Sequence, residues 1–113
     1  MAEPRGTVLR RQYDDLRRRI DAASTPARSA CLNFISSTFS SIGDAYEMAS
    51  SADRERMLNE VLGFSRKLWN EGSRPQALAL GVIVLNIESR FVAGDDAAFV
   101  KAETDALIEQ ART

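Results

Sequence analysis

The segment ALALGVIVLNI, residues 77–87, is a continuous apolar stretch that decides the fold. On an α-helix, at about 100° per residue, its side chains point in all directions, so the helix has no polar face to turn toward water. At about 1.5 Å per residue the segment is about 16 Å long, roughly half the thickness of a bilayer core. It therefore predicts a helix covered on all sides by other helices or by a partner, and we expect no membrane span.

The composition predicts one globular domain without catalytic chemistry. The chain has 113 residues, of which 44% are hydrophobic and 27% are charged, as is typical of a single domain over 1–113. It contains one cysteine and no histidine, and its glycines stand singly. The usual residues of nucleophilic triads, zinc sites and phosphate loops are therefore missing, and we expect no enzyme and no bound cofactor or metal. A single cysteine and the lack of an apolar leader favour a cytoplasmic location.

Charge is distributed unevenly along a nearly neutral chain. Residues 1–28 contain seven arginines and four acidic residues, whereas the rest contains eight basic and twelve acidic residues, for a net charge of −1 in all. Opposite charges at the two ends can attract each other between copies, which favours a homo-oligomer. The acidic residues interleaved with the first arginines would repel phosphates, so nucleic acid is the least favoured partner.

Capping signals and apolar spacing predict five helices, at about 7–23, 25–49, 50–71, 73–93 and 95–113. Thr7, Thr25 and Ser50 are the expected caps, and Gly72 and Gly94 the expected stops. The predicted fold is all-α, an up-and-down four-helix bundle over 25–113 with an additional N-terminal helix over 1–24. That first helix has a narrow apolar seam, so it either docks on the bundle or pairs with a second copy.

The second helix has an unusual outer face made of small hydroxyl side chains. It presents four serines where charged residues are usual: Ser36, Ser37, Ser40 and Ser41. Small side chains allow another helix to approach closely, so this face is a candidate slot for a partner. The competing interpretation is a marginal, locally kinked helix that faces solvent. On the opposite, apolar face Cys31 is expected to be buried and inert.

Trp69, Leu85 and Asn86 are three further candidates for partner contact. The third helix is predicted to pack through a face that contains Phe64, Leu68 and Trp69. Trp69, beside a short turn, is the expected anchor if a partner binds. Leu85 and Asn86 are the candidates on the central apolar helix. A buried Asn86 must find a hydrogen-bond partner, and it either fixes the register between helices or bonds a nearby carbonyl or water.

Two stretches resemble a known family. The sequence FSRKLW at 64–69 resembles the N-R-[RK]-L-W signature of the FlaF family of bacterial flagellar proteins, with Ser65 in the place of Asn. The sequence LGVIVLN at 80–86 resembles the apolar helix that follows in that family, and Thr25-Pro26-Ala27-Arg28 is similar to the S-P-R segment with which its conserved region opens. The likeness extends over 25–112.

This resemblance implies a cytoplasmic protein that is needed for flagellin production and export and acts by binding flagellin or a flagellar co-regulator, as a chaperone or regulator. The other interpretation is a structural or adaptor homodimer with a different protein partner. A chaperone should keep an apolar groove open, whereas a structural dimer should bury that groove in its own interface.

Overall fold

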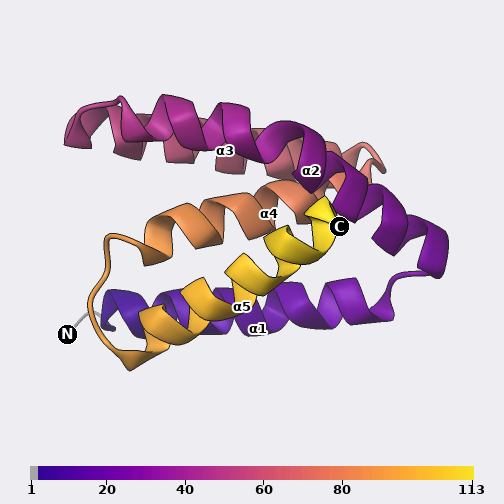
Figure 1. Cartoon of the computed structure of the whole chain (residues 1–113), viewed down its shortest axis with the longest axis horizontal. Coiled ribbons are helices and arrows are strands. Elements are labelled where there is room, and N and C mark those ends of the chain that lie inside the picture. The colour runs from indigo at the N-terminus through magenta and orange to yellow at the C-terminus, as the bar shows by residue number, and fades with distance from the viewer. Residues whose placement is uncertain (1–2) are drawn as a thin grey trace.

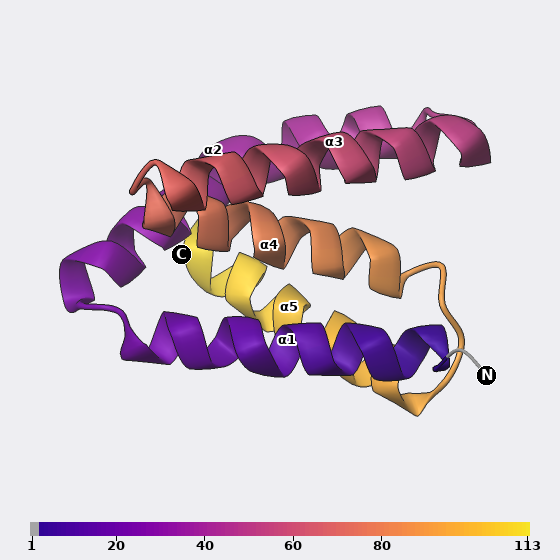
Figure 2. The same ribbon diagram turned by 180° about the vertical axis from the view of Figure 1, so that it is seen from behind.

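A computed structural model describes residues 3–113 and contains five helices (Figures 1 and 2). They are α1 (Arg5–Ala22), α2 (Thr25–Glu47), α3 (Ser51–Asn70), α4 (Arg74–Ser89) and α5 (Asp95–Arg112). No strand occurs within 3–113, so the predicted all-α class is confirmed for this part of the chain. No helix in the described range is long and apolar enough to cross a membrane.

Helix α4 occupies the centre and packs against each of the other four helices. In Figures 1 and 2 it runs between α2 and α3 on one side and α1 on the other, and α5 crosses it obliquely. From Ala77 to Ile87 every residue except Gly81 is buried. The prediction of a helix covered almost all round is therefore confirmed, and its cover comes from within the same chain.

Helix α1 docks against its own chain. Its seam residues Leu9, Tyr13 and Ile20 are buried against the core, and the helix packs on α4 and α5. Of the two arrangements open for the first helix, the structure has the intramolecular one. Helix α1 begins at Arg5, after Pro4, and not at the predicted cap Thr7, because Pro4 has the extended backbone of an N-cap and its missing N–H is not needed there.

The other helix ends follow the predicted signals to within a few residues. Ser24, not Thr25, caps α2: its Oγ accepts a hydrogen bond from the Ala27 N–H at 3.3 Å. Ser50 caps α3 as predicted, accepting from the Asp53 N–H at 3.3 Å. Gly72 and Gly94 have φ of +91° and +108°, conformations that glycine adopts without strain.

Helix α2 remains helical through its serines. The hydroxyls of Ser37 and Thr38 both donate to the Phe34 carbonyl, at 3.1 and 2.6 Å, as hydroxyl side chains commonly do within helices. All four predicted face residues, Ser36, Ser37, Ser40 and Ser41, are exposed. The serine segment is therefore helical, and its four serines lie on the outer surface.

Asn86 joins α4 to α5 through a buried polar network. Its Nδ2 donates to Thr104 Oγ1 at 3.0 Å and to Asp105 Oδ1 at 2.7 Å, and its Oδ1 accepts from Arg90 Nη2 at 2.8 Å. Asn86 and Thr104 are fully buried. Because hydrogen bonds from one amide reach two side chains of the next helix, this network fixes the register of α5 on α4.

Helix α3 is the least buried of the five, with Leu58 as its one buried residue. Among the other four helices, only α4 packs extensively on α3. The prediction that Phe64 lies on the packed face is wrong, since Phe64 is 52% exposed. The apolar arc of α3 is wider than the strip that a single neighbouring helix can cover, so the residues at its edge remain in solvent.

Candidate functional site

A groove runs along α4 between α1 and α3. Both helices pack on α4, but they do not pack extensively on each other, and Figure 2 shows α4 lying between them. We call this concavity the α4 groove. Its floor is a row of residues spaced three, four and three positions apart: Leu78, Gly81, Leu85 and Glu88.

Four neighbouring concavities make up the groove. From the α4 N-terminus to its C-terminus their volumes are about 310, 280, 200 and 460 Å³. Neighbouring concavities share lining residues: Trp69 and Leu78 between the first two, Gly81 between the second and third, and Glu88 between the last two. The four concavities therefore follow one another along about three turns of α4.

The two walls are apolar toward the floor and polar at the rim. On the α1 side lie Leu16 and, at the rim, Gln12, Asp15 and Arg19. On the α3 side lie Leu62 and, toward the α4 N-terminus, Ser65, Arg66 and Trp69. The hydroxyl of Ser65 donates to the Ala77 carbonyl at 3.0 Å, which attaches this wall to the start of α4.

Gly81 lies in the middle of the groove floor and has no side chain there. A Cβ at this position would lie 3.2 Å from Cδ1 of Leu16, which is closer than carbon atoms ordinarily pack. The missing side chain therefore allows Leu16 of α1 to approach the α4 backbone between Leu78 and Leu85. A glycine inside a helix costs about 1 kcal/mol relative to alanine, so close packing is a physical reason for it here.

Arginines surround the groove at its Trp69 end. The guanidinium carbons of Arg19 and Arg74 lie 4.7 and 4.8 Å from the indole centroid, within the range of cation–π attraction. Arg66 is exposed on the same wall. The described residues that line this end include no Asp or Glu. This end of the groove therefore carries excess positive charge beside an aromatic surface.

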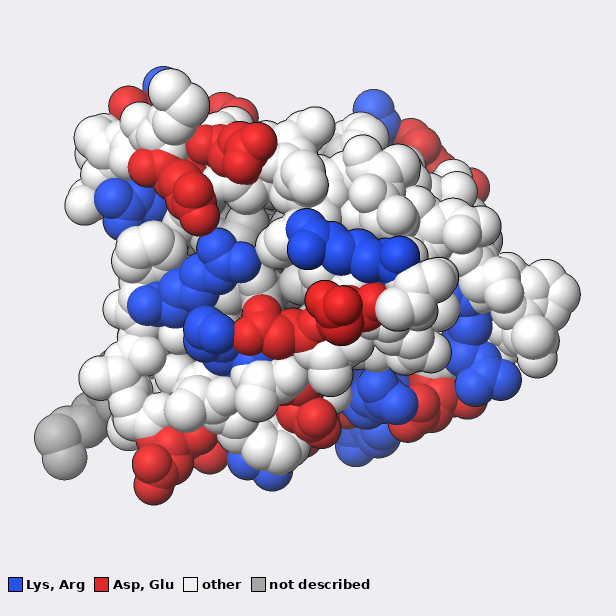
Figure 3. All heavy atoms as spheres, viewed as in Figure 1, with Lys and Arg blue, Asp and Glu red and all other residues white. Residues whose placement is uncertain are grey.

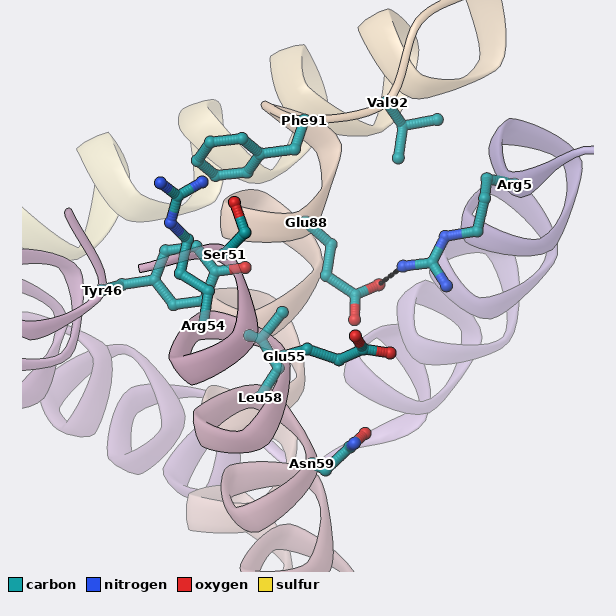
Figure 4. A pocket seen from close by; sticks show the side chains of 10 residues that line it. All are labelled: Arg5, Tyr46, Ser51, Arg54, Glu55, Leu58, Asn59, Glu88, Phe91 and Val92. Atoms are coloured by element: carbon teal, nitrogen blue, oxygen red, sulfur yellow. Dashed lines mark ion pairs between the residues drawn. The ribbon is translucent and has the colours of Figure 1, made fainter. Parts of the chain in front are cut away.

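The opposite end of the groove, at the C-terminus of α4, is lined by both basic and acidic side chains (Figure 4). Glu88 pairs with Arg5 across 3.7 Å, and its side chain is only 15% exposed. Burial raises the pKa of Glu88, and the nearby Arg5 only partly offsets this effect. Arg54 extends over the Phe91 ring, 4.6 Å from its centroid. Arg5, Arg54, Glu55 and Glu88 leave this end without excess charge.

The face of the molecule over α5 and α2 carries basic and acidic side chains side by side (Figure 3). Lys101 and Asp105 form one such pair at 2.8 Å. Such alternation is typical of a solvated surface, and it contrasts with the excess of arginine around Trp69.

The predicted contact residues separate into three places. Trp69 and Leu85 line the α4 groove, whereas Asn86 is buried in the network with α5 and does not line it. The serines of α2 are exposed but line none of the four concavities. Sequence reasoning missed Leu16, Leu62 and Gly81. The available signal was Gly81, a glycine without a turn or helix end to explain it.

Among the described residues that line the α4 groove there is no cysteine. Cys31 is 2% exposed in the core, and burial raises its pKa to about 11, so the thiol stays protonated. Within 3–113 no group of three or more histidine, cysteine or acidic side chains is placed to hold a metal ion. A floor that is apolar from Leu78 to Leu85, with charged rims, is suited to binding the apolar face of a helix.

Comparison of the chain with protein families, with curated proteins and with solved structures gives no significant match.

Proposed function

We propose that this is a non-catalytic, cytoplasmic protein-binding module in which the α4 groove receives the apolar face of an amphipathic helix from a partner protein. In this proposal the up-and-down bundle, with α1 as its additional helix, is the scaffold that holds the two groove walls apart. The observation that supports it is the open groove itself, with a floor that is apolar from Leu78 to Leu85 and rims of charged side chains.

The spacing of the floor suits a helical ligand. Leu78, Gly81, Leu85 and Glu88 follow one another at intervals of three and four residues. Helical ligands in grooves use anchor side chains at the same i, i+3, i+4 and i+7 intervals. A helix lying along α4 would therefore place successive anchors over successive concavities of the groove.

The α3 wall can adjust to a ligand more readily than the rest of the fold. It has a single buried residue, Leu58, and its extensive packing is with one helix. Elements with few buried apolar contacts open at low free-energy cost. Movement of α3 away from α1 would widen the groove without disturbing the α4–α5 network of Asn86 and Thr104.

The partner that we propose is flagellin or a flagellar co-regulator. This identity depends on the resemblance of 64–69 and 80–86 to the FlaF family. Trp69, the last residue of the signature-like stretch, and Leu85, within the apolar stretch, both line the groove. In this proposal the two stretches form one surface that retains an apolar segment of flagellin until export.

Light scattering on a sizing column tests the proposal, with the protein alone and then mixed with flagellin. The wild type should elute as a mixed complex. Leu62→Glu, which places a charge on the apolar wall, should abolish the complex, and Leu62→Ala should weaken it. Phe64→Glu is the matched control, since Phe64 is exposed on the same helix but does not line the groove.

Two outcomes would contradict the proposal. A complex that survives Leu62→Glu would place the binding surface elsewhere. A dimer that ignores flagellin and dissociates on Leu62→Glu would assign the groove to self-association, the alternative function. Circular dichroism of each variant verifies that it is folded.

A further inference from the structure

We infer that the partner helix carries acidic side chains at one end of its apolar stripe, and that this end docks at Trp69, over Arg19, Arg66 and Arg74. This inference rests on the proposed function of the α4 groove and adds the chemistry and the direction of the ligand. It follows from the unequal charge at the two ends of the groove.

The arginines at the Trp69 end are available to a ligand. Arg66 and Arg74 are exposed, and among residues 3–113 neither forms an ion pair with a carboxylate. Arg19 is paired with Asp15 at 3.2 Å, but that carboxylate also pairs with Arg18. Three guanidinium groups therefore share at most part of one acidic side chain.

The start of α4 adds positive potential at the same place. Its first turn contains no acidic residue, and the cap residue Ser73 makes no side-chain hydrogen bond to it. The positive end of the helix dipole is therefore not compensated by a carboxylate in its own first turn or by its cap residue. Arg74 and Pro75, in this first turn, line the groove beside Trp69.

The opposite end offers no such preference for anions. The side chain of Glu88 is only 15% exposed, and its carboxylate already pairs with Arg5 at 3.7 Å. Glu55 adds a second acidic side chain to the lining, and in Figure 4 it points toward Glu88. An acidic ligand end placed here would face two carboxylates together with Arg5 and Arg54, whereas at Trp69 it would face three arginines and no carboxylate among the described lining residues. Charge complementarity therefore sets one direction.

Trp69 lets the direction be measured, because it is the only tryptophan of the chain. The probes are synthetic amphipathic helical peptides with a leucine stripe, amidated at the C-terminus so that only side chains carry the negative charge. One peptide has two glutamates at an end of the stripe, and its twin has glutamines there. A nitroxide quencher is attached either at this end or at the opposite end.

The glutamate peptide should bind about tenfold more tightly than its glutamine twin, as expected for two partly exposed charge contacts. Its advantage should decrease with added salt. The quencher should lower Trp69 emission when it is at the acidic end and not when it is at the other end. Arg66→Gln with Arg74→Gln should remove the advantage. Lys67→Gln, at the neighbouring exposed position of α3, should leave it unchanged.

The outcomes separate this inference from the proposed function. Equal affinity of the two peptides, or quenching from the non-acidic end, would overturn the inference and leave helix binding intact. Failure of both peptides to bind would overturn the proposed function and this inference together. Binding that persists in Leu62→Glu would show that the peptides occupy a different surface, which would also overturn both.

Discussion

The guanidinium of Arg19 on α1 lies over the indole of Trp69 on α3, 4.7 Å from the ring centroid. The contact joins the two walls of the α4 groove at one end. At the other end Arg5 of α1 reaches the floor through Glu88, at 3.7 Å. At each end an arginine of α1 thus reaches into the groove, to the α3 wall at Trp69 and to the floor at Glu88, and the apolar middle lies between them.

Removal of the Arg19 contact should loosen the Trp69 end. Arg19→Ala should shift Trp69 emission to longer wavelength, increase its quenching by acrylamide, and lower the free energy of unfolding by about 0.5 to 1 kcal/mol, the usual worth of an exposed cation–π contact. Arg18→Ala is the control, because Arg18 pairs with the same carboxylate, Asp15, at 3.4 Å. Identical emission in the two variants would show that Arg19 does not cover the indole.

The Asn86 network should be the most sensitive polar site in the fold. Asn86→Ala leaves the Arg90 guanidinium without its amide acceptor and opens a cavity, so it should cost about 2 to 4 kcal/mol in denaturant unfolding. Thr104→Val should cost only about 1 kcal/mol, because the Asn86 amide would still donate to Asp105. Equal costs for the two substitutions would contradict the network as described.

Glu88 should make stability depend on pH. Burial raises its pKa above the ordinary value of 4.5, so the folded state binds more protons than the unfolded state between the two values. The free energy of unfolding therefore falls as pH rises through this window, and the loss persists at neutral pH.

Glu88→Gln should accordingly be more stable than wild type at pH 7, and the difference should vanish once the pH is below the ordinary pKa. Denaturant unfolding of both proteins across this pH range measures the difference. A variant that is less stable than wild type at pH 7 would show that the Arg5 pair outweighs the cost of burial.

Cys31 should react only when the protein unfolds. Its thiol is 2% exposed and its pKa is raised to about 11 by burial, so thiolate and access are both lacking at pH 8. A disulfide reagent should label Cys31 slowly in native buffer. In denaturant the labelling should be complete within the time needed to mix the solutions. Rapid labelling of the native protein would place Cys31 at the surface.

The sequence predicted what depends on local pattern. Residues 77–87 have no polar face, and they are buried apart from Gly81. Gly72 and Gly94 were predicted as stops, and both have positive φ. Cap positions were one residue off where two hydroxyls are adjacent, as at Ser24 and Thr25, because either can supply the oxygen to the first turn.

The sequence did not predict the groove, because it depends on how far apart two distant helices lie. Leu16 and Leu62 have the spacing of ordinary packed residues. The opening between them exists because α1 and α3 both pack on α4 and do not pack extensively on each other. The exposure of Phe64 was not predicted for a similar reason. The width of an apolar arc on a helix gives no information on how many neighbouring helices cover that arc.

Amide chemical-shift mapping tests the central claim most directly. The labelled protein is titrated with the glutamate-ended leucine-stripe peptide, and the shifts are plotted along the chain. The α4 groove predicts changes concentrated in 12–19, 62–69 and 78–88, with Trp69 among the largest and the α2 serines unaffected. Changes confined to the serine face of α2 or to the outer surface of α5, with none in these three segments, would contradict it.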